Sequence, residues 1–179
     1  MTRFVALFRG VNVGGNTRLP MGELKALALE LGYAEPQTLL NSGNLVFSSA
    51  EPARETKRRL EAAIGERFGF TPTTFLRDAT QWRAIIDANP LRDEAAQDPS
   101  HLLVTVLRDT PPEGAIEALR AAIVGRETVA LAGTTLYTVY PDGIGRSKLD
   151  NPLVEKTLKT RGTARNWNTV LKLATLLEG

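Results

Sequence analysis

The order of strand and helix patterns most constrains how this 179-residue chain can fold. Apolar runs rich in β-formers predict strands, and apolar residues three and four positions apart predict helices. The first half gives a strand at 4–8, a helix at 21–31, strands at 37–41 and 44–48, a helix at 53–68 and a strand at 71–76. This order is that of the ferredoxin-like, or split βαβ, plan.

A similar order follows in the second half, after a short helix at 79–88. It gives a strand at 102–108, a helix at 112–123, strands at 127–131 and 134–140, a helix from about Pro152 and a last helix at 166–177. We therefore predict an α+β fold: a ferredoxin-like split βαβ first half, a similar βαββα second half and a C-terminal helix. The expected division is a subdomain at 1–78, a linker helix and loop at 79–100, and a second subdomain at 101–179.

Composition removes several classes of chemistry. The chain has no cysteine, which excludes disulfides, thiolate nucleophiles and Cys-ligated metals. Its one histidine, His101, leaves no His-rich metal site, and no Ser or carboxylate spacing around it suggests a triad. We expect no metal, no cofactor and a structural role for His101.

No segment is typical of export or of a membrane span. Only five apolar residues stand between Arg3 and Arg9, which indicates a strand rather than a signal peptide. No window approaches the roughly 18 apolar residues of a transmembrane helix. We expect a cytoplasmic protein without a membrane partner.

Positive charge gathers toward the end of the chain. Residues 141–179 hold 7 basic and 4 acidic side chains, whereas the overall net charge is +2. Within 145–172 the basic residues are Arg146, Lys148, Lys156, Lys159, Arg161, Arg165 and Lys172. This segment is the predicted anion-facing surface.

Two candidate binding segments lie in the first half. The loop after the first strand offers Arg9, Asn12, Gly14 and Gly15, whose backbone N–H groups and one cation suit an anion. The alternative is a plain connection capped by Asn12. The loop lacks the spacings of a dinucleotide fold and a P-loop.

The second of these segments is the predicted hairpin turn, where Ser42 and Asn44 offer a hydroxyl and an amide. The alternative is a turn without a ligand. In a split βαβ sheet we expect this turn to lie about 17 Å from the loop after the first strand, at the opposite edge. One compact pocket would not easily use both segments.

Two further candidates lie in the basic C-terminal part. Arg146, Ser147 and Lys148 precede a helix for which Asn151 is the expected cap, and they suit a phosphate or a nucleic-acid backbone. Asn166 is the expected N-cap of the last helix. It is flanked by Arg165 and Asn168 around a natural anion position. The alternatives are a solvated basic loop, and a helix start held by a buried Trp167.

Four sequence segments resemble those of one family. They are Arg9-Gly10-Val11-Asn12-Val13-Gly14-Gly15, Asn41-Ser42-Gly43-Asn44-Leu45-Val46-Phe47, Gly145-Arg146-Ser147-Lys148-Leu149, and the stretch from Arg165-Asn166-Trp167-Asn168 to Leu173. Together they are similar to the bacterial domain of unknown function 1697 family, and the resemblance spans nearly the whole chain. It implies an α+β fold with ferredoxin-like subdomains in a bacterial protein. It implies no established activity and no catalytic residues.

Three functions remain open at this stage. The first is binding of a phosphate-bearing or other anionic ligand, a nucleotide or nucleic acid, through the basic C-terminal segment. The second is a protein-interaction module without chemistry. The third is a cofactor-independent enzyme on an anionic substrate, with Ser42 or Ser147 and Lys148 as reactive groups, which requires a buried Lys148. The sequence leaves the oligomeric state open.

Overall fold

The computed structural model describes residues 1–179, with eight strands in two four-stranded sheets interleaved with helices. The chain divides into two compact units, Met1–Ala84 with Lys172–Gly179, and Ile85–Leu171. The predicted α+β, two-part ferredoxin-like fold is confirmed. The subdomain limits expected from the sequence, 1–78 and 101–179, stay a prediction.

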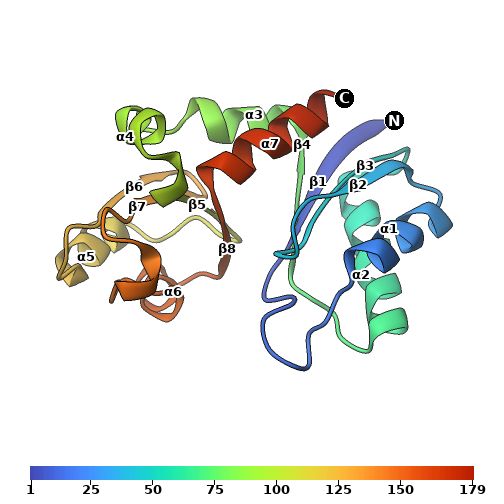
Figure 1. The fold of residues 1–179 in the computed structure, drawn as a ribbon, viewed down its shortest axis with the longest axis horizontal. Coiled ribbons are helices and arrows are strands. Elements are labelled where there is room, and N and C mark those ends of the chain that lie inside the picture. The colour runs from blue at the N-terminus through green and yellow to red at the C-terminus, as the bar shows by residue number, and fades with distance from the viewer. The chain divides into compact units, whose positions relative to one another are not determined.

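The first sheet has the order β2-β3-β1-β4, and every adjacent pair is antiparallel. Phe4, Ala6 and Phe8 alternate along β1 and pack with Leu24 of α1 and Ile64 of α2 in one apolar cluster. Figure 1 shows both helices on the same face of this sheet. The elements are β1 (Thr2–Phe8), α1 (Met21–Glu30), β2 (Ala34–Thr38), β3 (Asn44–Ser49), α2 (Ala53–Phe68), β4 (Thr74–Asp78) and α3 (Ala79–Asp87).

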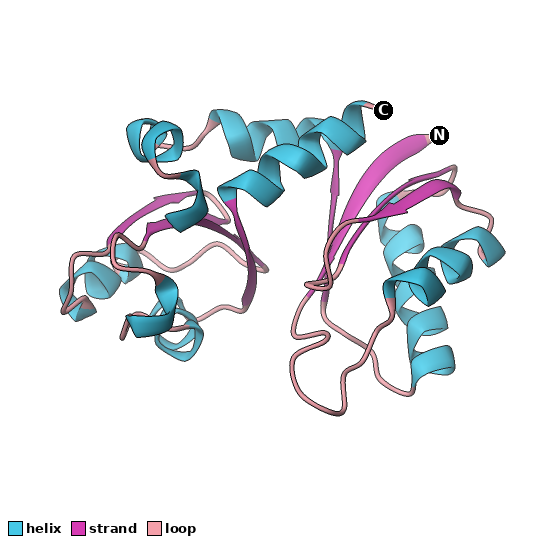
Figure 2. Ribbon diagram, viewed as in Figure 1, coloured by secondary structure: helices cyan, strands magenta, loops and turns pink.

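The second sheet repeats this topology with the order β6-β7-β5-β8. Its core joins Leu107 of β5 and Leu136 of β7 to Leu119 of α5 and Leu158 of α6. Figure 2 shows the strands in magenta and the helices that accompany them in cyan. The elements are α4 (Arg92–Gln97), the 3₁₀ turn η1 (Pro99–His101), β5 (Leu102–Leu107), α5 (Ala115–Ala122), β6 (Thr128–Ala132), β7 (Thr135–Val139), the 3₁₀ turn η2 (Ile144–Arg146), α6 (Asn151–Leu158), β8 (Gly162–Asn166) and α7 (Trp167–Glu178).

Strand β8 is the one strand that the sequence patterns do not predict; helix α4 and the two 3₁₀ turns were not predicted either. It pairs antiparallel with β5, from Leu107 opposite Gly162 to Leu103 opposite Asn166. Its composition is polar, so strand pairing rather than local β-propensity forms it. A Cβ on Gly162 would lie 2.9 Å from the carbonyl oxygen of Val106, so only glycine fits here without displacing the neighbouring strand.

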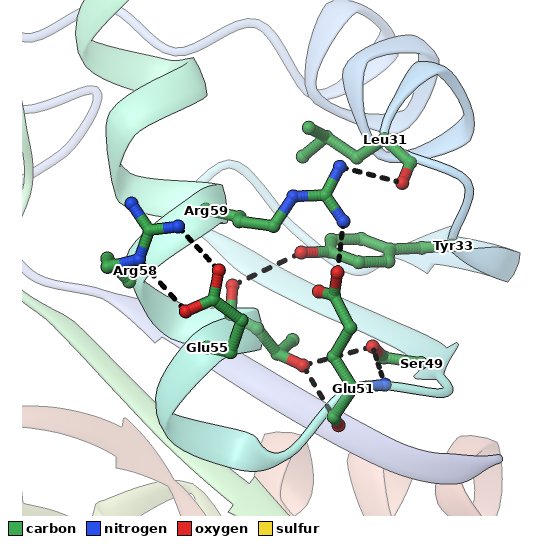
Figure 3. A network of polar contacts seen from close by, with 8 residues as sticks. Leu31, Tyr33, Ser49, Glu51, Glu55, Arg58 and Arg59 are labelled. Carbon is green, nitrogen blue, oxygen red and sulfur yellow. Dashed lines mark hydrogen bonds and ion pairs between the residues drawn. The ribbon is translucent and has the colours of Figure 1, made fainter.

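A polar network fastens the helices of the first sheet to its edge (Figure 3). Arg59 of α2 forms an ion pair with Glu51 and also donates to the carbonyl oxygen of Leu31 at the end of α1. Its guanidinium lies 6.0 Å from the ring centre of Tyr33, which stacks on Phe47 at 4.8 Å. These charges therefore have structural partners and leave no free ligand site here.

Gly43 closes the connection between β2 and β3 in a conformation that excludes larger residues. Its φ is +91°, and an added Cβ would lie 2.5 Å from Cγ2 of Val11. Its carbonyl oxygen accepts from the N–H of Phe8 at 3.0 Å. The turn is thus packed directly against the end of β1.

We expect Gly43→Ala to lower the free energy of unfolding by about 3 kcal/mol, because positive φ and overpacking both oppose the new methyl group. The matched control is Gly14→Ala, where φ is +94° but no atom lies within 4 Å of the new Cβ. The control should lose only about 1–2 kcal/mol. Equal losses in denaturant titrations of the two variants would show that the contact with Val11 has no energetic weight.

All three tyrosines of the chain are buried with raised pKa values. Burial raises the pKa of Tyr137 and of Tyr140 to about 12, and it also raises the pKa of Tyr33. The phenol of Tyr140 donates to the carbonyl oxygen of Leu149 at 2.9 Å, and that of Tyr33 to Thr56 at 3.2 Å. The fold therefore holds these protons to higher pH than the unfolded chain does.

An unfolded tyrosine ionises near pH 10, whereas the buried ones keep their protons to higher pH. The raised pKa values therefore contribute fully to the free energy of unfolding below about pH 10, and this contribution is lost between about pH 10 and 12. At about pH 11 Tyr137 and Tyr140 should be mostly protonated in the native protein, and added denaturant should raise the tyrosinate absorbance strongly. Tyr140→Phe should flatten the pH dependence of stability in that window. Tyrosinate already present in the native protein at about pH 10 would contradict the burial argument.

Candidate functional site

The loop after β1 and the turn before β3 lie together, not about 17 Å apart as the sequence argument expected. The reason is the strand direction: β1 and β3 are antiparallel with Leu7 opposite Asn44, so β3 begins where β1 ends. The Nδ2 group of Asn12 donates to the carbonyl oxygen of Asn41 at 2.7 Å. The structure thus brings the two first-half candidate segments into contact.

Within this pair of segments, both asparagine side chains are used by the protein itself. Asn12 also donates to the carbonyl oxygen of Leu19 at 3.0 Å and accepts from the Leu19 N–H at 2.8 Å. The amide of Asn44 is fully buried and donates to the carbonyl oxygen of Leu39 at 2.6 Å and to Ser42 Oγ at 3.1 Å. These contacts hold the loop and the turn in shape.

The remaining first-half candidates lie at the surface of the same region. Gly14 and Gly15 are exposed, and Gly14 has φ +94°. Arg9 is half-buried, and its backbone N–H donates to the carbonyl oxygen of Thr73 at 3.0 Å. Anion binding by these three residues stays a prediction.

The segment before α6 has a braced backbone and exposed cations. Ser147 Oγ donates to Glu127 Oε1 at 2.7 Å and accepts from the N–H of Leu149 at 3.0 Å. Arg146 and Lys148 are exposed. Because Lys148 is exposed, it lacks the burial that the enzyme hypothesis required of it. The cap of α6 is Asp150, which accepts from Leu153 N–H at 3.0 Å, so the expectation of Asn151 as the cap was wrong.

The three candidates around the start of α7 differ in environment. Arg165 lies in β8 and is buried, and it donates to Thr163 Oγ1 and to the carbonyl oxygen of Ala164, both at 2.8 Å. Burial lowers the pKa of Arg165 to about 10, so its guanidinium stays charged at pH 7. Asn166 Oδ1 accepts from the N–H of Thr169 at 2.9 Å, which confirms the predicted N-cap, and Asn168 is exposed.

A small cavity of about 150 Å³ in the second unit lies beside Asn166 and η2, but none of Arg146, Ser147 and Lys148 lines it. Asn166 of β8 and Ile144 of η2 line it, together with His101 and Tyr140. Antiparallel pairing explains this meeting, because the start of β5 lies opposite the ends of both β7 and β8. Residues far apart in the sequence thereby reach one end of the sheet.

His101 has a carboxylate partner that the sequence argument missed. Its Nδ1 lies 2.6 Å from Oδ2 of Asp98, and Ser100 Oγ donates to Oδ1 of the same carboxylate at 3.2 Å. A carboxylate only accepts, so Nδ1 carries the hydrogen. The three-residue spacing across the turn Asp98-Pro99-Ser100-His101 was the available signal, because such a turn returns the fourth residue to the first.

The described residues contain no group of three or more His, Asp or Glu side chains placed to hold a metal ion. None of the helices has the length and apolar character of a membrane span. The candidate chemistry therefore rests on cations, amides, the His101–Asp98 pair and cavities.

Comparison with known proteins supports the fold and the family. A solved structure described as that of the conserved bacterial protein SP0830 from Streptococcus pneumoniae is 21% identical, with a TM-score of 0.75 and 98% of each chain covered. At this identity the likeness shows the shared fold alone. No match is found among curated proteins. The family described as "Protein of unknown function (DUF1697)" matches residues 1–137. The match includes the two first-half segments, and the resemblance of the two C-terminal segments stays a prediction. The predicted family is thus confirmed, and the chain belongs to the DUF1697 family.

Proposed function

We propose that this protein binds a phosphate-bearing or other anionic ligand, a nucleotide or nucleic acid, through a basic segment near its C-terminus. The basic segment is defined by five side chains: Arg146, Lys148, Lys156, Lys159 and Arg161. All five are exposed, and none forms an ion pair. Arg165 is buried and Lys172 belongs to the other unit, so neither is included.

The single observation that carries the proposal is the contrast with other arginines of the chain. Seven of the arginines outside this segment have carboxylate partners: Arg3 with Glu35, Arg58 with Glu55, Arg59 with Glu51, Arg67 with Glu30, Arg83 with Glu178, Arg108 with Asp109 and Arg126 with Asp142. The five cations of the basic segment have no carboxylate partner and can therefore attract an anionic ligand. A cluster of uncompensated cations raises the local concentration of anions.

The two acidic residues within this stretch act on the backbone instead. Asp150 accepts from the N–H of Leu153 at 3.0 Å, and Glu155 Oε1 lies 3.5 Å from the N–H of Gly162. They stabilise the start of α6 and the start of β8. Their negative charge reduces the field of the segment without occupying its cations.

The asparagine contacts in the first unit favour the second candidate function, an interaction module without chemistry. Asn12 and Asn44 spend their amide hydrogens on protein carbonyls and on Ser42 Oγ. That use is expected where polar segments hold the protein together and bind no ligand. An unaltered protein that binds anions no more tightly than the triple variant of the basic segment described next would support this second candidate.

We expect the protein to bind a short labelled single-stranded oligonucleotide with an affinity that falls steeply between about 50 and 200 mM salt. The triple variant Lys148→Gln, Lys156→Gln, Arg161→Gln should weaken binding and reduce the salt slope by about 2, because each phosphate contact contributes about 0.7 on single strands. The variants are compared by fluorescence anisotropy at several salt concentrations.

The matched control is Arg18→Gln, Lys25→Gln, Arg54→Gln, which removes three exposed cations without ion pairs from the first unit. It has the same net charge as the test variant. If both triple variants lose the same affinity, binding follows net charge and the basic segment is not the site. If the unaltered protein shows no salt dependence, the nucleic-acid version of the proposal is wrong.

A further inference from the structure

The largest cavity described in the second unit lies apart from the basic segment and from the small cavity. It has a volume of about 380 Å³, within the range of about 300–1,000 Å³ usual for small-molecule sites. The end of α3, helix α4 and the first turn of α7 form its walls. None of the residues singled out as candidate ligands in the sequence lines it.

One buried polar group in the wall of this cavity has no partner. Asn89 is 2% exposed, and its Oδ1 accepts from the N–H of Leu91 at 2.9 Å. This bond fixes the orientation of the amide, because only the oxygen can accept. The Nδ2 group is then left without a hydrogen-bond acceptor. A buried donor of this kind is stabilised by a ligand oxygen.

Two opposite charges also line the cavity. The Arg92 guanidinium donates to the backbone carbonyl of Asp87 at 2.7 Å and makes no other hydrogen bond. The carboxylate of Asp87 makes no hydrogen bond or ion pair. Residues that carry a cation, an amide donor and a carboxylate therefore line one space. A ligand with only negative groups would meet the Asp87 carboxylate unfavourably.

The rest of the lining offers apolar surface. Trp167 is 8% exposed, and Leu171, one helical turn further along α7, is 42% exposed. Both residues line the cavity. A flat or branched apolar body suits such a surface. Covering this exposed leucine with a ligand favours binding, because apolar surface is removed from water.

We infer that this cavity binds a small zwitterion of the α-amino acid class with an apolar side chain. The ligand carboxylate accepts from Asn89 Nδ2 and from Arg92. Its ammonium group pairs with Asp87, and its side chain packs on Trp167 and Leu171. The inference does not rest on the proposed anion binding, since the cavity and the basic segment share no residue.

The test uses three probes that differ in one group each: phenylalanine, 3-phenylpropionate without the ammonium, and phenethylamine without the carboxylate. Binding to the full chain is followed by NMR through the indole N–H of Trp167 and the side-chain amide of Asn89. We expect phenylalanine to bind most tightly, with each deleted charge weakening binding about tenfold or more. Equal binding of the three probes, or no shift of the Trp167 signal, would overturn the inference.

Two variants make the result specific to the cavity. Asn89→Asp keeps an oxygen for the Leu91 N–H but removes the donor, and should weaken phenylalanine binding at least about tenfold. Ala96→Phe fills the cavity from an exposed position on α4, and Ala26→Phe on α1 is its matched control. Phenylalanine binding that survives in Ala96→Phe would contradict the assignment to this cavity. So would an equal loss of binding in Ala96→Phe and Ala26→Phe. Both outcomes can be read even if Asn89→Asp does not fold.

Discussion

The inner strands β1 and β5 each run antiparallel to both of their neighbours, and this pairing decides which loops meet. In the first unit it sets Leu7 opposite Asn44, so the loop after β1 contacts the turn before β3. In the second unit it sets Leu103 opposite Asn166, so the start of β5 shares one end of the sheet with the ends of β7 and β8. The two first-half family segments therefore meet, and in the second unit Asn166 reaches the same cavity as Ile144, the residue before the third segment.

Electrostatics separates the regions that hold the fold from the region proposed to bind. Carboxylates next to Arg59, Arg67 and Arg126 neutralise those cations locally, and the Arg67 guanidinium beside Glu30 holds the pKa of that carboxyl below its usual range. The basic segment has no such partners. Exposed pairs add little to stability, so their presence elsewhere does not explain the fold, but their absence leaves a surface to which anions are attracted.

The fold was largely predictable from the sequence because apolar periodicity records which faces are buried. Helix α2 matches the expected range 53–68, and β3 begins at Asn44 as expected. The expected strand at 37–41 was misplaced, because β2 spans Ala34–Thr38 and residues 39–43 connect it to β3 in place of a two-residue turn. Strand β8 was not predictable in this way. Its residues Thr163 and Arg165 are buried by pairing with β5, and polar residues give no apolar alternation to read.

The candidate sites were less predictable, since side-chain partners depend on register and on nearby turns. The contact of Asn12 with Asn41 needs the antiparallel direction of β1 and β3, which a list of strand patterns does not contain. Asp98 beside His101 needs the 3₁₀ turn η1. Asn89 becomes a candidate ligand only because it is buried. In the sequence an asparagine before a proline indicates a turn and nothing more.

The most direct measurement of the central claim maps anion binding residue by residue. Two-dimensional NMR of isotope-labelled protein is recorded while inorganic phosphate, and separately a short oligonucleotide, is added. We expect the backbone amide shifts to concentrate between Arg146 and Arg161, with those of Arg18, Lys25 and Arg54 unmoved. Shifts spread evenly over every exposed cation, or centred on another part of the chain, would contradict it.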